Sequence, residues 1–141
     1  MSKPLFDAKA IAALAVRDLA LGEADSQLVE AATALANEAQ ANCGKDKHQL
    51  VKSIHVVGPG ETDSTWTVSD KDGNTFDNAT GLRAGPNEAL VVARTQRKSD
   101  GEDYAWYHEE AGVGPSYYMR RAANSVRGSF PGLDISEPAP I

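Results

Sequence analysis

The sequence predicts an α+β domain, with N-terminal helices and a C-terminal helix packed on a small, mainly antiparallel β-sheet. Two observations support this fold class. Apolar residues recur every three or four positions near both ends of the chain, which is the spacing of one helix face. Between them, residues 53–97 contain short runs rich in β-branched residues, separated by Gly, Pro and Asp turn signals. Helices that flank such strands favour a helix layer on one face of a sheet.

The first segment of the chain, residues 5–21, is rich in alanine and predicts a helix. Its apolar residues share one helix face at Ile11, Leu14, Ala15 and Leu19. Gly22 can end this helix. We therefore expect residues 1–23 to form a helical extension that precedes a main α+β domain over residues 24–130.

A second helix is predicted over residues 27–42, where small and apolar residues again recur at helical spacing. Asp25 or Ser26 has the chemistry of its N-cap, and Gly44 can end it. Cys43 lies at the end of this Ala-rich helix, where a buried small residue is more common than a nucleophile.

Residues 44–57, GKDKHQLVKSIHVV, predict a capped helical turn that leads into a strand. Asp46 is a good N-cap residue, and Gln49 follows three positions later, which is the spacing of a capping box. The β-branched residues of SIHVV then favour a strand. The alternative is a reactive site that uses His48 or His55, because His48 lies close enough to Asp46 in sequence for acid–base pairing.

Strands and turns are predicted over the middle of the chain. Residues 64–70 and 74–80 favour two strands joined by the turn KDG, and residues 88–97 favour a further strand. Residues 115–130 predict a closing helix that starts at Pro115. Its apolar side shows four-residue spacing at Tyr118, Ala122 and Val126.

The last segment, residues 131–141, has three prolines and little helical or strand pattern. We expect an extended Pro-rich arm that is either mobile or laid on a neighbouring subunit.

Composition excludes several classes of function. The chain has 141 residues and a formal net charge of −6, so no global basic field favours tight, non-specific DNA binding. Its single cysteine cannot form an internal disulfide, and the opening MSKPLFDAKA lacks the apolar stretch of a signal peptide. No apolar run approaches the roughly 20 residues that span a bilayer. These features favour a protein made in a reducing cytoplasm.

Chemical motifs are weak. His108 precedes Glu109 and Glu110, but a zinc-protease helix needs a second His four positions after the first, where this chain has Gly112. No phosphate-binding loop is present in the sequence pattern. We therefore predict no catalytic residue, no metal ligand and no cofactor.

The aromatic residues are distributed unevenly. Five of them crowd into residues 104–118, namely Tyr104, Trp106, Tyr107, Tyr117 and Tyr118. Such residues dominate both protein cores and interface hot spots, so both a packed core and a subunit interface remain open. In an acidic protein, the nearby Arg120, Arg121 and Arg127 favour pairing with carboxylates of a neighbouring chain.

Three segments, in this order, resemble the head–tail joining, or tail-completion, proteins of long-tailed bacteriophages. DKHQLVKSI matches the family's Asp-Thr-Gly-x-Leu-Arg-x-Ser-Ile element at Asp46, Leu50, Ser53 and Ile54. YAWYHEEAG matches its Tyr-Ala-x-Tyr-x-Glu-x-Gly segment at Tyr104, Ala105, Tyr107 and Glu109. PSYYMRRAA is similar to its closing Ala-Arg-Pro-Phe-Leu-Arg-Pro-Ala helix at Tyr118, Met119, Arg120 and Ala122.

The resemblance implies a non-enzymatic virion protein of the neck, made in the cytoplasm of a bacterial host. Such a protein forms a ring of about six or twelve identical subunits between the DNA-filled head and the tail, through which double-stranded DNA passes. Its partners would be the adjacent head-closure, tail-terminator or tail-tube proteins, and no membrane. Asp46, Leu50 and Ser53 would fix the turn before the sheet. Packing or subunit contacts would involve Tyr104, Trp106, Tyr107, Glu109, Tyr117, Tyr118 and Arg120.

The alternative function is a small cytoplasmic α+β enzyme or ligand-binding domain. Its chemistry would depend on one of the three histidines, His48, His55 or His108.

Overall fold

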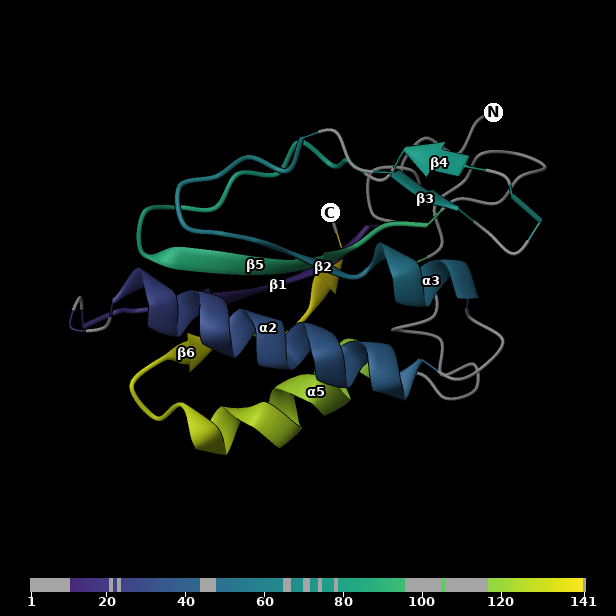
Figure 1. The fold of residues 1–141 in the computed structure, drawn as a ribbon. Coiled ribbons are helices and arrows are strands. Elements are labelled where there is room, and N and C mark those ends of the chain that lie inside the picture. Colours follow the sequence, from purple (N-terminus) through teal and green to yellow (C-terminus); the bar gives the residue numbers. More distant parts are fainter. Residues whose placement is uncertain are drawn as a thin grey trace, which may run out of the picture.

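The structure is a computed structural model of the 141-residue chain. The residues that it describes are 11–20, 22, 24–43, 48–64, 67–69, 72–73, 75–77, 79–95, 105 and 117–140. Within them the fold is α+β, with two helices on one face of an antiparallel sheet (Figure 1).

The main sheet has five strands in the order β2-β5-β1-β6, and β7 also pairs with β1. These strands are β1 (Ala12–Arg17), β2 (His55–Val57), β5 (Glu88–Ala93), β6 (Asp134–Ile135) and β7 (Ala139–Pro140). The longest ladder joins β1 to β5, from Ala12 opposite Ala93 to Arg17 opposite Glu88. Because β1 and β5 are central, they position every other strand of this sheet.

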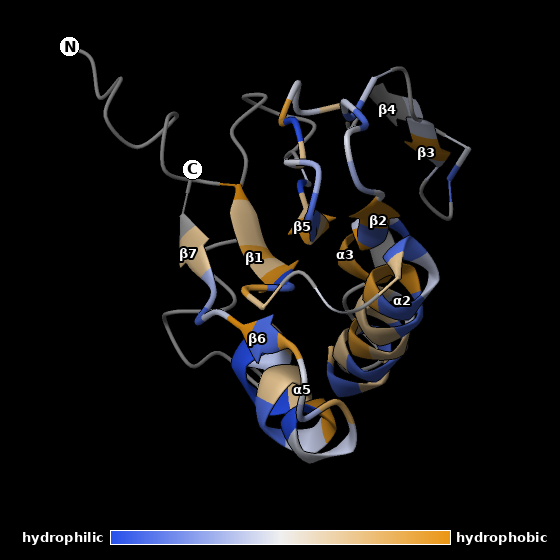
Figure 2. Ribbon diagram, turned by 90° about the vertical axis from the view of Figure 1, so that its left-hand side faces the viewer, coloured by the Kyte–Doolittle hydropathy of each residue, from blue (hydrophilic) through white to orange (hydrophobic). Residues whose placement is uncertain are grey.

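Two helices, α2 (Asp25–Asn42) and α5 (Tyr118–Val126), form the layer on one face of the sheet, and they pack against each other. Figure 2 shows this layer from the side, with α2 and α5 on the same side of the strands. The remaining elements are α3 (His48–Ser53), the 3-10 helix η1 (Arg127–Ser129), and the separate hairpin of β3 (Thr67–Ser69) and β4 (Thr75–Asp77).

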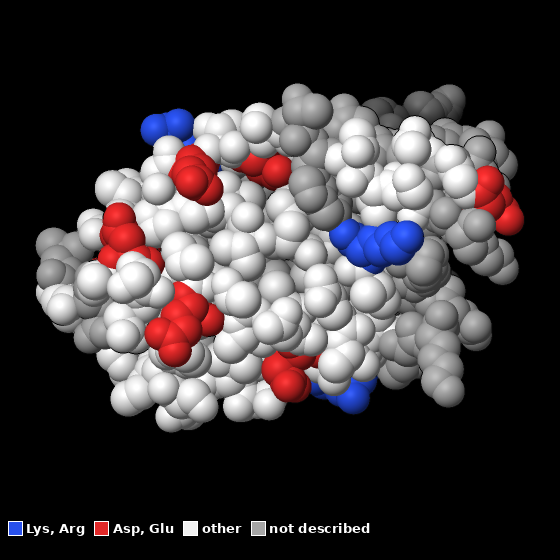
Figure 3. Space-filling model, in the orientation of Figure 1, with Lys and Arg blue, Asp and Glu red and all other residues white. Residues whose placement is uncertain are grey.

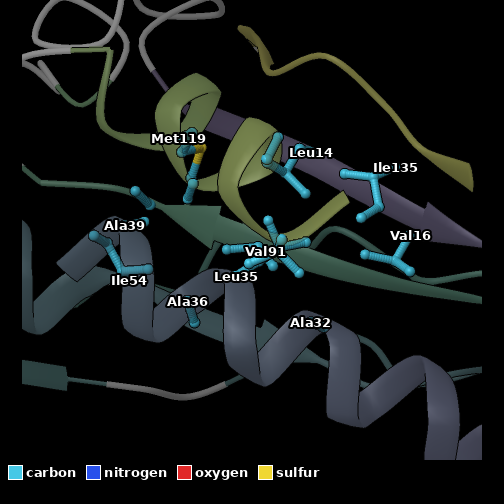
Figure 4. Packing of buried hydrophobic residues seen from close by; sticks show 14 of the residues in the cluster. Leu14, Val16, Ala32, Leu35, Ala36, Ala39, Ile54, Val91, Met119 and Ile135 are labelled. Atoms are coloured by element: carbon cyan, nitrogen blue, oxygen red, sulfur yellow. The ribbon is translucent and has the colours of Figure 1, made fainter. Parts of the chain in front are cut away.

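The core lies between the sheet and the two helices. Alternate residues of β1, Leu14 and Val16, point to this side, where they meet Val91 of β5 and Leu35 of α2 (Figure 4). The opposite side of the strands has a smaller apolar cluster of Ala13, Val57, Ala84 and Val92. Both faces of the central strands are therefore covered by apolar contacts.

The predicted helix over residues 5–21 is wrong where the structure describes it, because residues 12–17 form the central strand β1. All five residues from Ala12 to Val16 are buried. A continuous apolar run fits a strand covered on both faces as well as it fits a helix, and alanine's helix propensity is too weak to decide between them. The segment is thus part of the main sheet and not a helical extension.

The second helix is confirmed, but its predicted N-cap is wrong. The N-cap of α2 is Ala24, with no side-chain cap, and Asp25 is the first residue of the helix. There its carboxylate stabilises the positive end of the helix dipole. The helix ends at Asn42, before the predicted Gly44, with Cys43 as the C-cap.

The structure confirms most of the later elements. The helical turn before the sheet is α3, and it runs through Ser53 into β2 as predicted. The KDG hairpin is confirmed by the pairing of β3 with β4, and Gly73 in its turn has a φ of +86° that favours glycine. The closing helix is confirmed as α5, whose apolar side, Tyr118, Ala122 and Val126, is buried, but it begins at Tyr118 after the N-cap Tyr117 and not at the predicted Pro115.

The Pro-rich arm lies extended along the sheet of its own chain. Its strands β6 and β7 both pair with β1 of the same chain. Ile135, Leu133 and Pro138 are buried. Sequence patterns missed the pairing of the arm with β1 because β6 and β7 are only two residues long each. In addition, their partner segment, β1, was predicted as a helix.

Candidate functional site

The described aromatic and arginine residues among the predicted packing or interface groups fall into two classes. Tyr118 is fully buried, and its hydroxyl donates a hydrogen bond to the Ala105 carbonyl oxygen at 2.6 Å. Tyr117 is 40% exposed, and the Arg120 guanidinium lies 5.6 Å from the centre of its ring. Packing is therefore the role of Tyr118, whereas Tyr117 and Arg120 form an exposed cation–π pair at the start of α5.

Tyr117 has an unusual backbone conformation. It is the N-cap of α5 and has φ 56° and ψ 36°, in the left-handed region. A residue other than glycine pays about 1 kcal/mol or more in this region, and such strain is common where a side chain is held for function. In this conformation the Tyr117 ring lies at the surface, next to Arg120.

The turn before the sheet is organised as the sequence predicts at two of its three positions. Leu50 is 2% exposed in the core, and the buried Ser53 hydroxyl donates to the Leu50 carbonyl oxygen at 2.8 Å. Ser53 thus satisfies a carbonyl at the end of α3, where helix carbonyls have no helical partner. The amide of Gln40 on α2 donates to the Ile54 carbonyl oxygen at 3.2 Å, which anchors this turn to the helix layer.

A polar cluster lies beside this turn: the His55 cluster, in which the candidate His55 meets Asp63 and Thr80, two partners that sequence reasoning missed. His55 Nε2 lies 3.0 Å from Asp63 Oδ2, and the two side chains are 14% and 5% exposed. The same carboxylate oxygen accepts hydrogen bonds from the Thr80 amide at 3.1 Å and the Thr80 hydroxyl at 2.7 Å. One buried oxygen therefore joins β2 to two separate loop segments.

The other ring nitrogen of His55 is also occupied. Nδ1 lies 2.6 Å from the Ser53 carbonyl oxygen, so Nδ1 carries the hydrogen of that bond, since a carbonyl only accepts. A general base needs a ring nitrogen free to reach a substrate proton. In this geometry both nitrogens serve the fold, and His55 is better suited to hold loops than to transfer protons.

The backbone around the His55 cluster completes a small loop layer. The Asp63 amide donates to the Leu82 carbonyl at 2.8 Å, and the Gly81 amide donates to the Asp63 carbonyl at 3.0 Å. Gly81 has a φ of +74°, a conformation that favours glycine here. Leu82 and Ala84 pack on Val57 and Val92. The His55 cluster therefore holds these loop residues against the face of the sheet opposite the helices.

A second set of contacts ties the Pro-rich arm to α5 and η1. Arg127 Nη2 donates to the Ile135 carbonyl oxygen at 3.1 Å and lies 3.4 Å from Glu137 Oε2. Arg120 Nε lies 3.4 Å from the other oxygen of Glu137. The sequence predicted carboxylates of a neighbouring chain as the partners of these arginines, whereas Arg120 and Arg127 contact Glu137 of their own chain, which no local pattern indicated.

The remaining predicted residues include several that lie outside the described part of the chain. Asp46, Tyr104, Trp106, Tyr107, His108 and Glu109 are not described, and neither is the side chain of His48. Cys43 is fully buried, and its thiol donates to the Ala39 carbonyl oxygen at 3.2 Å, so its environment is that of a small core residue.

Among the described residues, no three His, Cys, Asp or Glu side chains are grouped closely enough to hold a metal ion. The helices in this part of the chain are all too short or too polar to cross a bilayer. No protein-family model matches the sequence, and a comparison with curated proteins gave no match.

Proposed function

We propose that the chain is a structural subunit of the neck of a phage or phage-derived particle, in which a ring of identical copies joins the DNA-filled head to the tail. The observation that carries this proposal is the burial, in the structure, of residues that resemble tail-completion proteins. Of the described positions that resemble tail-completion proteins, all but the exposed Arg120 are buried, namely Leu50, Ser53, Ile54, Ala105, Tyr118, Met119 and Ala122. These residues therefore act in the fold, as shared residues of related proteins would.

Two of the three similar segments also meet in space. The hydrogen bond from the Tyr118 hydroxyl to the Ala105 carbonyl joins the second segment to the third, although they are 13 residues apart in sequence. The first segment reaches the same helix layer, because its Ile54 carbonyl accepts from Gln40 of α2. One shared scaffold for all three segments supports a common fold with that family.

Charge supports a ring through which DNA passes. Helix α2 exposes Asp25, Glu30 and Glu38 and has no lysine or arginine. Figure 3 views the molecule from the helix side shown in Figure 1, and acidic groups outnumber basic groups on that face. A channel lined by such a helix would repel phosphates and let DNA slide. A lumen lined mainly by Lys and Arg in an imaged ring would contradict this orientation.

The exposed Tyr117 and Arg120 supply the chemistry of a subunit contact, since Tyr and Arg are enriched at interface hot spots. Tyr117→Asn removes the ring and keeps a residue that tolerates the left-handed region. We expect this variant to keep its melting temperature within a few degrees and to lose ring formation. Val29→Gln, at the 38% exposed Val29 of α2, is the matched control and should assemble normally.

The experiment that tests the proposal is negative-stain imaging of the purified protein, alone and mixed with tail tubes or DNA-filled heads of the same particle. The proposal predicts rings, or added density at one end of tubes or at the portal of heads. Unbound monomers in every mixture would contradict it and would return attention to the histidine-based enzyme.

A further inference from the structure

We propose that residues 133–140, here called the strap, pair with β1 of a neighbouring copy when subunits assemble, so that adjacent subunits are joined by exchanged straps. This inference rests on the proposed ring, and it names the contact that closes the ring. The strap is the only described segment that covers the outer edge of β1, through β6 and β7.

The strap matches the β1 edge along its whole length. Ile135 lies opposite Val16 in β6, and Ala139 lies opposite Ala13 in β7. Between these short ladders the Ser136 amide donates to the Ala15 carbonyl at 2.9 Å, while the Ser136 hydroxyl accepts from the Ala15 amide at 2.8 Å. The β1 edge is therefore a site for an added strand, and this sequence is one that fits it.

Side chains give the site its specificity. Leu133 and Ile135 are 8% and 5% exposed, and both belong to the main core cluster together with Met119 and Val126 of α5. The strap thus fills an apolar slot between β1 and α5. An identical strap from another copy restores every one of these contacts, so exchange leaves the contact energy nearly unchanged.

The ion pairs of the strap are weak. Glu137 is 64% exposed, and its contacts with Arg120 and Arg127 are both 3.4 Å long. Exposed ion pairs of this kind stabilise a fold by well under about 1 kcal/mol. Apolar burial and the hydrogen bonds to β1 therefore provide most of the strap's attachment, and both are the same in its own subunit and in a neighbour.

A short hinge precedes the strap. Exposed Pro131 and Gly132 form the turn between η1 and β6, in which the Leu133 amide donates to the Phe130 carbonyl at 3.0 Å. Opening this single turn redirects the strap without unfolding α5 or β1, and glycine supplies the backbone freedom that this needs. Once subunits are side by side, a neighbour's slot lies within reach of the strap at a high effective concentration, so that exchange becomes possible.

Exchange also gives the symmetry that a ring needs. The strap and the β1 edge are different surfaces, so each subunit donates on one side and accepts on the other. Such head-to-tail contacts are heterologous, and they close into rings when the rotation between subunits permits. The inference thus predicts which two surfaces meet at each subunit boundary.

The test uses single cysteines at the opposed Ala13 and Ala139, in a background with Cys43→Ser. Directly opposed residues of an antiparallel pair have Cβ atoms about 5 Å apart, which is close enough for a disulfide after slight adjustment. The double variant A13C/A139C is the control, and as a dilute monomer it should form an intrachain disulfide. The single variants A13C and A139C are then mixed, allowed to assemble and oxidised.

Exchange predicts covalent dimers in the mixture, joining on the order of a quarter of neighbouring subunits, because a quarter of random donor–acceptor pairs carry both cysteines. Each single variant alone should give none. Assembled rings without covalent dimers, alongside an intrachain disulfide in the control, would overturn the exchange and leave the neck proposal standing. A failure to form any oligomer would overturn it as well. Covalent dimers that bind neither tail tubes nor heads would instead contradict the neck proposal.

Discussion

The two flanks of the main sheet are held in different ways. At the β2 flank, the His55 cluster places three polar groups around one buried carboxylate oxygen, at 2.7 to 3.1 Å. At the β1 flank, the strap adds two ladders of two residues each and ion pairs that are exposed. Buried polar contacts therefore fix the β2 flank, whereas the short ladders and exposed ion pairs of the β1 flank suit it to separate and pair again.

The largest effect is expected at the β2 flank, from Asp63→Ala. Removing this carboxylate leaves the His55 ring and the Thr80 amide without their partner in a site that is mostly buried. Groups left in this state cost about 3 kcal/mol of the free energy of unfolding. Chemical denaturation measures this loss in the free energy of unfolding. Glu38→Ala, on the exposed face of α2, is the matched control, and its free energy of unfolding should change by no more than about 0.5 kcal/mol.

Asp63→Asn sharpens the same prediction. The amide keeps an oxygen that accepts from Thr80, so we expect a smaller loss, about half of that of Asp63→Ala. Equal losses for Asp63→Ala and Glu38→Ala would show that the His55 cluster does not hold this flank.

A second effect, of about 2 kcal/mol, is expected at the β1 flank from Ile135→Ala. This side chain is 5% exposed in the core cluster, so its truncation loses apolar burial and leaves a cavity. The loss should appear to a similar extent in the melting temperatures of the monomer and of the assembly, because the slot has the same occupant in both states. A variant that melts normally would contradict the packing of the strap.

The smallest effect is expected from Glu137→Ala, which removes both ion pairs of the strap. Because Glu137 is 64% exposed, the free energy of unfolding should change by no more than about 0.5 kcal/mol. Thermal denaturation at low and at 1 M salt checks this, since screening removes the remaining difference. A loss as large as that of Ile135→Ala would mean that polar ties, and not apolar burial, attach the strap.

Much of the fold could be predicted because its signals are local. The four-residue spacing of Tyr118, Ala122 and Val126 gave α5, and the KDG turn gave the β3–β4 hairpin. Alternation and turn residues require no knowledge of distant partners. The strand β1 was missed since AALAV is apolar at every position, and the sheet that surrounds it forms from residues more than 70 positions away.

The site was less predictable than the fold. Leu50 and Ser53 were found through a motif that fixes one local turn. His55 was identified as a polar candidate, but its partners Asp63 and Thr80 come from loops, and only the folded chain brings them together. Glu137 lies in a segment whose prolines indicated an unpaired arm, and the two arginines that it meets are on α5 and η1.

The contrast between the two flanks is tested most directly by hydrogen exchange of the monomer, followed peptide by peptide. The account predicts that residues 134–140 exchange by a separate opening, faster than β2 and β5 by tenfold or more, while β5 and the β1 amides bonded to it remain protected. Asp63→Ala should then raise exchange around residues 79–84 and leave the strap unchanged. Equal protection of the strap and of β5, lost together in one global unfolding event, would contradict it.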